Sequence, residues 1–171
     1  MTLENRPIQG GHLYPVVVAN KDSSPIPVEA TITSDDIWTP ALYADEVADD
    51  SDKSVTVTAG QVWEILWIWV ELTTSADAGN RQLVIQIQDN AADVIAEVRT
   101  GIVQAASITR NYLFAPAISD MTAFRDTDYL TTPLSPTFIL PEAFVIRVYD
   151  NNAIAAAADD MVIQMGYAYK A

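Results

Sequence analysis

The sequence predicts an all-β fold: a β-sandwich of about eight short strands, preceded by an extended N-terminal arm. Two observations support this prediction. From residue 54 onward, apolar and polar residues alternate in short runs that turn-forming residues separate, and no convincing helical pattern is present. Before that point, five of the nine prolines interrupt the chain. The 171 residues suffice for an ordinary hydrophobic core, and the absence of cysteine excludes disulfides and thiolate metal sites.

Residues 1–53 are predicted to form the arm. Proline cannot donate to a sheet ladder, so short apolar pieces such as Pro25-Ile26-Pro27-Val28 suit edge strands or extended segments that lie on another surface. The stretch 35–52 holds seven acidic residues and no basic one. It suits a solvated acidic loop or, alternatively, a weak cation site, because carboxylates are hard oxygen ligands. The candidate ligands of that site are Asp45, Glu46, Asp49, Asp50 and Asp52.

Residues 54–171 are predicted to form the sandwich. A long irregular stretch at 117–132 interrupts the strands, and eight is also the strand count of a jelly roll. The expected strands cover residues 54–58, 62–74, 81–89, 93–100, 107–115, 136–140, 143–150 and 160–169.

The strand at 62–74 is the strongest element, because both of its faces are apolar. Strict alternation places Trp63, Trp67 and Trp69 on one face, and Leu66 and Ile68 on the other. Such a strand must be covered on both sides, either by two protein layers or by one layer and a neighbouring subunit. The three tryptophans are therefore candidates for core or for an oligomer or capsid interface, with an aromatic sugar-binding platform as the alternative.

Charge limits the partners. The chain has 23 acidic and 9 basic residues and a net charge of −14, which repels nucleic acid and anionic membrane surfaces. The longest apolar run, residues 65–70, is far shorter than the ~20 residues of a membrane-spanning helix. We therefore expect neither nucleic acid nor membrane as a partner, and no signal peptide.

The sequence does not favour an enzyme. Its single histidine, His12, follows Gly10 and Gly11 in the arm, where a catalytic base is improbable. A glycosidase needs two carboxylates near each other, but strict alternation places Glu64 and Glu71 on opposite faces of their strand. We predict no catalytic residue and no cofactor.

Several segments share a pattern with a known class of protein. The pattern has an Ala-Gly entry to a tryptophan-containing strand, a Thr-Ser turn, and a Gly-Asn-Arg step into a strand that ends in Asp. It resembles a pattern that recurs in small virion proteins of tailed bacteriophages, and it covers residues 55–116 best. The matching segments are 57–66, 72–76, 79–89, 104–107 and 112–116, with the Pro-Ile-Pro-Val element at 25–28.

The resemblance implies a jelly-roll auxiliary virion protein of the capsid decoration or cement type, made in the host cytoplasm and located on the capsid exterior. It implies a homotrimer and, as partner, the major capsid protein; no catalytic residues come with this class. The acidic stretch 35–52 departs from the pattern. The alternative function is a head-fibre or tail/baseplate module that binds a host receptor or glycan.

Overall fold

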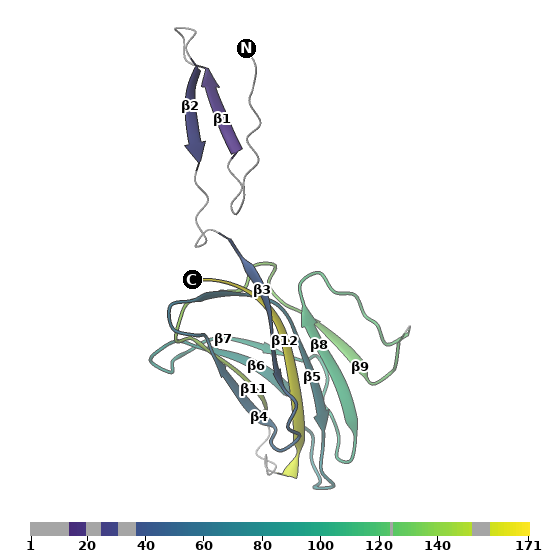
Figure 1. The fold of residues 1–171 in the computed structure, drawn as a ribbon. Helices are drawn as coiled ribbons and strands as arrows, with labels where there is room; N and C mark the ends of the chain where they lie inside the picture. Colours follow the sequence, from purple (N-terminus) through teal and green to yellow (C-terminus); the bar gives the residue numbers. More distant parts are fainter. Residues whose placement is uncertain (1–13, 20–24, 31–36, 124, 152–157) are drawn as a thin grey trace. The chain divides into compact units, whose positions relative to one another are not determined.

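The computed structural model describes residues 14–19, 25–30, 37–123, 125–151 and 158–171. The chain divides into two compact units: Met1–Trp38 with Lys170–Ala171, and Thr39–Tyr169. In the first unit, β1 (Tyr14–Ala19) and β2 (Pro25–Ala30) pair as an antiparallel two-stranded sheet (Figure 1). The predicted interface segment Pro25, Ile26, Pro27 and Val28 lies in β2.

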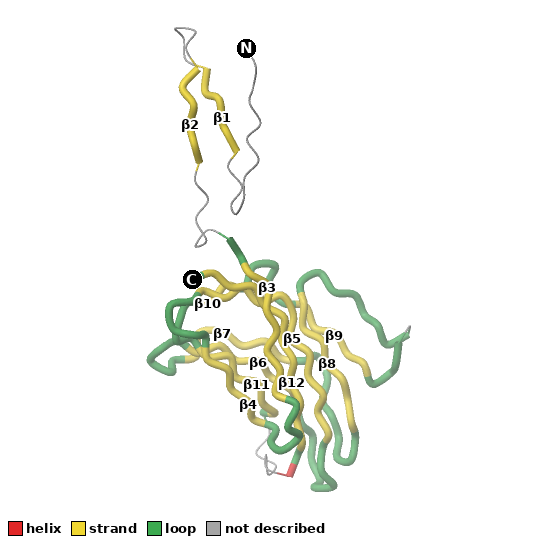
Figure 2. Tube along the Cα trace, viewed as in Figure 1, coloured by secondary structure: helices red, strands yellow, loops and turns green. Residues whose placement is uncertain are grey.

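The second unit is a sandwich of two sheets, which confirms the predicted fold class (Figures 1 and 2). One sheet has the strand order β3-β12-β5-β8-β9, with the short β10 paired to β5, and the other has the order β4-β11-β6-β7. The strands are β3 (Thr39–Asp45), β4 (Asp52–Thr56), β5 (Val62–Thr73), β6 (Leu83–Gln88), β7 (Val94–Arg99), β8 (Thr109–Ala115), β9 (Tyr129–Pro133), β10 (Ile139–Leu140), β11 (Val145–Asp150) and β12 (Asp160–Lys170).

The strand pairing is that of a jelly roll. If β9 and β10 are set aside, eight strands remain, and the first pairs with the last (β3 with β12). The second pairs with the seventh (β4 with β11), the third with the sixth (β5 with β8), and the fourth with the fifth (β6 with β7). This is one long hairpin rolled on itself into two layers. The short β9 and β10 are additions between the sixth and seventh strands, and β9 pairs with β8 in parallel.

The core lies between the two sheets and is made by alternate residues of their strands. The long strands β5 and β12 and the central strand β6 supply much of it, because their inward positions are almost all branched or long apolar side chains. These include Ile68, Val70, Leu72, Leu83, Ile85, Ile87, Ile146, Val148, Met161, Ile163 and Met165, each at most 2% exposed.

The strand β5 does not alternate strictly along its length. Ile65 and Ile68 are both buried although they are three residues apart, whereas Leu66 between them is 40% exposed. An extra residue of this kind moves all later side chains to the other face. It occurs where the partner on one side of β5 changes, from β10 opposite Trp63 to β8 opposite Ile68.

This irregularity corrects two expectations. Trp63 was expected to share a face with Trp67 and Trp69, but it faces the core, where it is 3% exposed and stacks on Tyr167 at 4.1 Å between ring centroids. Glu64 and Glu71, expected on opposite faces, both lie between buried neighbours and so face outward together.

Two strands lie where the sequence analysis expected none. Strand β3 pairs with β12, from Thr39 opposite Tyr169 to Asp45 opposite Ile163. Residues 39–53 were assigned to the arm. The pattern of β3 is weak because it is an edge strand, with Pro40 near its start and mostly exposed side chains. Strand β9 lies within the stretch expected to be irregular, and its five residues are too few to show a clear alternation.

Candidate functional site

The outward faces of the two sheets differ in chemistry. On the four-stranded sheet, polar side chains of neighbouring strands bind one another: Glu97 accepts hydrogen bonds from Gln86 at 2.9 Å and from Arg99 at 2.8 Å. These hydrogen bonds, that from Arg99 above all, lower the pKa of Glu97. On the same face, Arg147 donates to Asp52 at 2.8 Å. The polar groups of this face thus bind each other.

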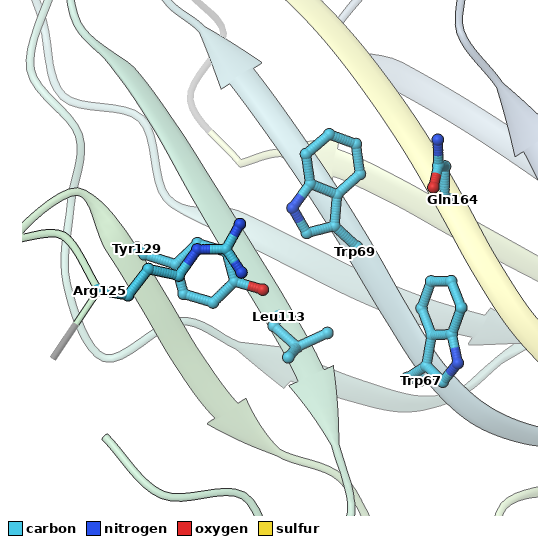
Figure 3. A pocket seen from close by; sticks show the side chains of 6 residues that line it. All are labelled: Trp67, Trp69, Leu113, Arg125, Tyr129 and Gln164. Carbon is cyan, nitrogen blue, oxygen red and sulfur yellow. The ribbon is translucent and has the colours of Figure 1, made fainter. Parts of the chain in front are cut away.

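The outward face of the other sheet is aromatic and carries a groove of about 320 Å³ (Figure 3). The name aromatic groove is used below for this hollow and its lining side chains. They come from three strands of the sheet, from the loop before β9 and from the first residue of β9: Trp67, Trp69, Leu113, Arg125, Tyr129 and Gln164.

Sheet register places these side chains side by side. Trp69 lies opposite Leu113 across the β5–β8 pair, and Tyr129 lies opposite Asn111 at the start of the parallel β8–β9 pair. Gln164 lies on β12, the neighbour of β5 on the other side. Figure 3 shows Trp69 between Gln164 and the Arg125–Tyr129 pair. Most of the groove is therefore built on paired strands.

Trp67 is accommodated by a glycine. A Cβ atom on Gly166 of β12 would lie 2.2 Å from Nε1 and 2.4 Å from Cε2 of the Trp67 ring, closer than any real contact. The indole ring can lie against β12 because the residue beneath it has no side chain. The glycine thus fixes the position of the ring at one end of the aromatic groove.

Arg125 stands at the other end of the groove. Its guanidinium lies 3.9 Å from the centroid of the Tyr129 ring, and its backbone N–H donates to the carbonyl oxygen of Met121 at 2.9 Å. Five of the seven basic residues within the described ranges form salt bridges with carboxylates, but Arg125 forms none there. Its charge is therefore available to a ligand.

The loop that carries Arg125 is held by local hydrogen bonds. The backbone N–H of Thr122 donates to Oδ1 of Asp120 at 2.9 Å, which lowers the pKa of that carboxyl. The hydroxyl of Thr131 in β9 donates to the carbonyl oxygen of Ser119 at 3.0 Å. These bonds tie the loop to β9 and so help to set the height of Arg125 above the sheet.

A second surface lies beside Trp67 on the same sheet and is called the apolar patch below. Its members are Leu42, Leu66 and Ile139, which are 62%, 40% and 48% exposed. Leu42 lies opposite Gly166, the residue under Trp67, and Ile139 lies opposite Glu64. The three residues thus lie on β3, β5 and β10 of one sheet, with Gly166 of β12 and the Trp67 ring between Leu42 and the other two.

The predicted interface residues are placed as follows. Trp67 and Trp69 line the aromatic groove, and Trp63 lies in the core. The side chains of Pro25, Ile26, Pro27 and Val28 lie outside the described residues, as does the lone His12. The interface role of these residues stays a prediction.

The candidate metal ligands bind cationic, amide and backbone partners of the chain itself. Asp45 and Asp49 both contact the Lys53 ammonium, which lies 3.6 Å from Asp45. Burial alone would lower the pKa of Lys53, but these two carboxylates outweigh it and raise it. Asp52 binds Arg147, Glu46 accepts from Gln164 at 3.0 Å, and Asp50 accepts from a backbone N–H. Within the described part of the chain, no three carboxylate or histidine groups are placed to hold an ion.

Sequence reasoning found the two tryptophans of the groove but missed its polar residues. Arg125 is one of several basic residues dispersed singly along the sequence, and no local pattern marks it as an arginine without a carboxylate partner in the described part of the chain. Gly166 breaks the run of large residues in β12, and it was the one signal of a close approach from a neighbouring side chain.

No protein-family profile matches the chain, and no curated protein matches it. Among solved structures, the VP2 subviral particle of infectious bursal disease virus is similar at 12% identity and a TM-score of 0.36, over 92% of this chain and 38% of that one. The structure of the Gx strain of that virus is similar at 12% identity and a TM-score of 0.30, over 99% of this chain and 46% of the other. An exo-β-agarase is similar at 10% identity and a TM-score of 0.32, over 94% of this chain and 22% of that one.

The chain thus spans less than half the length of these three neighbours. Viral capsid proteins and an enzyme both occur among them, and at these scores the likeness is no basis for a function. In the described residues, no helix has the length and apolarity to cross a membrane.

Proposed function

We propose that this chain is a structural, non-enzymatic protein of a tailed-phage virion that decorates the capsid exterior as a homotrimer. The observation that carries the proposal is the apolar patch of Leu42, Leu66 and Ile139 on the outward face of the sheet. The resemblance of residues 55–116 to small phage virion proteins supports the class of particle. Major capsid protein and further copies of this chain are the proposed partners.

The patch suits contacts between copies. Contiguous exposed apolar side chains on a soluble domain commonly mark an interaction surface, whereas single ones do not. Leu42 and Ile139 lie on strands at either side of β12 and β5, so the patch extends across the sheet. A threefold arrangement buries such a patch against a different surface of the next copy and closes after three contacts.

The hairpin of β1 and β2 is the proposed contact with the capsid. A two-stranded sheet has two unpaired edges, and an edge can add a strand to a neighbouring sheet through main-chain hydrogen bonds. Pro25 and Pro27 leave β2 with fewer donors, which disfavours uncontrolled pairing. The net charge of −14 favours an outer position, away from packaged DNA.

The first test measures mass and capsid binding. Sedimentation of the full chain should give three times the monomer mass. The double variant Leu42→Lys with Leu66→Lys should raise the dissociation constant of the trimer by about tenfold or more. Val94→Lys is the matched control, because Val94 is 52% exposed on the opposite sheet. Equal effects of the two changes, or a strictly monomeric chain at high concentration, would contradict the trimer.

The second test addresses the arm. A chain without residues 1–33 should keep its trimer mass and lose most of its affinity for empty capsids of the parent phage. Unchanged capsid affinity would remove the docking role from the arm.

The alternative, a head-fibre or tail/baseplate module that binds a host receptor or glycan, is favoured by one observation, the aromatic groove. Separated head and tail fractions of the virion decide between the two locations. The chain in the tail fraction alone would replace the capsid proposal with the alternative.

A further inference from the structure

We propose that the aromatic groove binds an acidic saccharide, with one pyranose ring against the tryptophans and its carboxylate on Arg125. This inference goes beyond the capsid role, because it concerns a surface other than the apolar patch and the arm. It assigns a ligand class to Trp67, Trp69, Arg125 and Gln164.

The groove is rich in donors that the chain itself does not use. Among the described residues, the indole N–H of Trp69 donates no hydrogen bond within the chain, whereas that of Trp63 donates to Gln61 at 2.8 Å. The guanidinium of Arg125 rests on the Tyr129 ring and has no carboxylate partner in the same part of the chain. Such donors favour a ligand with hydrogen-bond acceptors, and a guanidinium binds an ionised acceptor such as a carboxylate most strongly.

The unpaired arginine is unusual for this molecule. Carboxylates are abundant in a chain with 23 acidic and 9 basic residues. The other arginines of the sandwich each form a salt bridge with a carboxylate. Tyr129, which is 5% exposed, supports the guanidinium from below and so acts as a positioning residue. The free charge of Arg125 is therefore held in one place, facing the groove.

The opposite end of the groove suits hydroxyl groups. The amide of Gln164 donates to Glu46 at 3.0 Å, so this end has the amide carbonyl of a lining residue and, beside the lining, an acceptor carboxylate. A second carboxylate would be repelled by Glu46, whereas sugar hydroxyls can donate to it. The ligand is thus oriented, with its carboxylate toward Arg125 and its hydroxyls toward Gln164.

Shape and size also match a sugar. Flat aromatic side chains fixed on strands offer faces to the C–H groups of a pyranose ring, and Leu113 adds an apolar contact between them. The volume of about 320 Å³ lies at the small end of ligand pockets and fits one or two rings.

A peptide fits the groove less well. The strands that carry it, β12, β5 and β8, are all paired on both sides, so their backbone groups cannot bind an added strand. Nucleic acid is disfavoured by the net charge of −14. A saccharide needs side-chain contacts alone, which is what this face provides.

The test titrates the full chain with galacturonic acid and with N-acetylneuraminic acid, each of which carries one carboxylate, and uses the methyl ester of galacturonic acid as the uncharged control. Binding is followed by NMR of the indole N–H groups and by tryptophan fluorescence. We expect at least one acidic probe to bind and shift the signals of Trp67 and Trp69, but not that of Trp63 in the core. The ester should bind about tenfold more weakly or worse.

Two variants test the role of charge. Arg125→Gln should weaken binding of the acidic probe by about tenfold or more, and Arg99→Gln by less than about twofold. The control removes the same charge from an exposed arginine on the opposite sheet. Trp69→Leu should weaken binding of acid and ester alike, because it removes the stacking face.

Several outcomes would overturn the proposal. They are equal binding of acid and ester, unchanged affinity in Arg125→Gln, and no binding of either acidic probe at about 10 mM. A change in oligomeric mass on Arg125→Gln would show instead that a second copy occupies the groove. None of these results bears on capsid binding through the arm, so the two proposals fail separately.

Discussion

Arg81 and Asp159 form an ion pair with no exposed surface. The Nε of Arg81 donates to Oδ2 of Asp159 at 2.7 Å, and Nη2 donates to Oδ1 at 2.9 Å. The backbone N–H of Ser75 adds a third bond to the same carboxylate at 2.6 Å. The Asp159 carboxylate therefore ties Ser75, in the turn after β5, to the start of β12, although these two residues are 84 positions apart in the chain.

Asp159→Asn leaves a guanidinium buried without its counter-charge. Because removal of one partner of a buried pair is far more costly than loss of a surface pair, the free energy of unfolding should fall by about 3–5 kcal/mol. Urea denaturation measures this fall. Asp160→Asn, at the exposed neighbouring residue, should change it by less than about 0.5 kcal/mol. Similar effects of the two substitutions would contradict the role of the pair.

The same carboxylate gives the stability a pH dependence. Burial raises the pKa of Asp159, but hydrogen bonds from Arg81 and Ser75 outweigh it, so the pKa lies below its ordinary value. A lowered pKa in the folded state stabilises the fold above the unfolded value of about 3.9, and this contribution disappears as the pH falls through the folded pKa. The difference in unfolding free energy between the native chain and Asp159→Asn should be constant from about pH 6 to 8 and shrink below about pH 4. A difference that grows in acid would show the opposite sign.

Gly166→Ala places a methyl group where the Trp67 ring lies, 2.2 Å from its Nε1. The rigid ring must move, so we expect a loss of about 1–3 kcal/mol in the free energy of unfolding. The loss should be smaller when Trp67→Leu is also present, because the smaller side chain leaves room. A double-mutant cycle by urea denaturation measures this coupling. Additive effects would show that the contact does not determine the position of the ring.

At the scale of elements, β3 decides where the folded sandwich begins. It is the first strand of the jelly roll, and its removal would leave one edge of β12 unpaired along seven residue pairs. A chain that starts at residue 37 should therefore keep a cooperative thermal transition, whereas one that starts at residue 54 should lose it or unfold at a much lower temperature. Circular dichroism and calorimetry measure both. Equal transitions of the two chains would support the predicted boundary at residue 53.

The elements that the sequence predicted well are those whose two faces differ. Strands β11 and β12 alternate between core and outward residues over six residues or more, and their positions were predicted to within a few residues. Strand β3 was missed because both of its faces are largely exposed, so burial left no pattern in its sequence. The sequence predicted about eight strands, as many as the jelly roll contains. The predicted set, however, includes β10, which is an addition to the jelly roll, and omits its first strand, β3.

The candidate site was predictable only in part for the same reason. Tryptophans at 67 and 69 stood out, but the assignment of faces assumed strict alternation through residues 62–74. The extra residue between Ile65 and Ile68 has no sequence signal, because it is set by the exchange of β10 for β8 beside β5. The position of Arg125 depends on the parallel pairing of β9 with β8, a contact that a local pattern does not encode.

At the scale of the whole molecule, charge opposes assembly and apolar contact favours it. The net charge of −14 makes copies of the chain repel one another, and most of the basic residues of the sandwich are already neutralised by carboxylates within the chain. Association through Leu42, Leu66 and Ile139 therefore gains from apolar burial and loses from long-range repulsion.

Salt weakens the repulsion and leaves the apolar term unchanged, so it should change the affinities of the two proposed surfaces in opposite directions. Between about 0.02 M and 0.5 M NaCl the screening length falls severalfold, which weakens repulsion between copies and leaves apolar burial in place. The dissociation constant of the proposed trimer should therefore fall with salt, as measured by sedimentation. Over the same range, galacturonic acid should leave the groove more readily, because salt screens the attraction of its single carboxylate to Arg125. A trimer that dissociates with added salt would show that ion pairs between copies, and not the apolar patch, hold the assembly together.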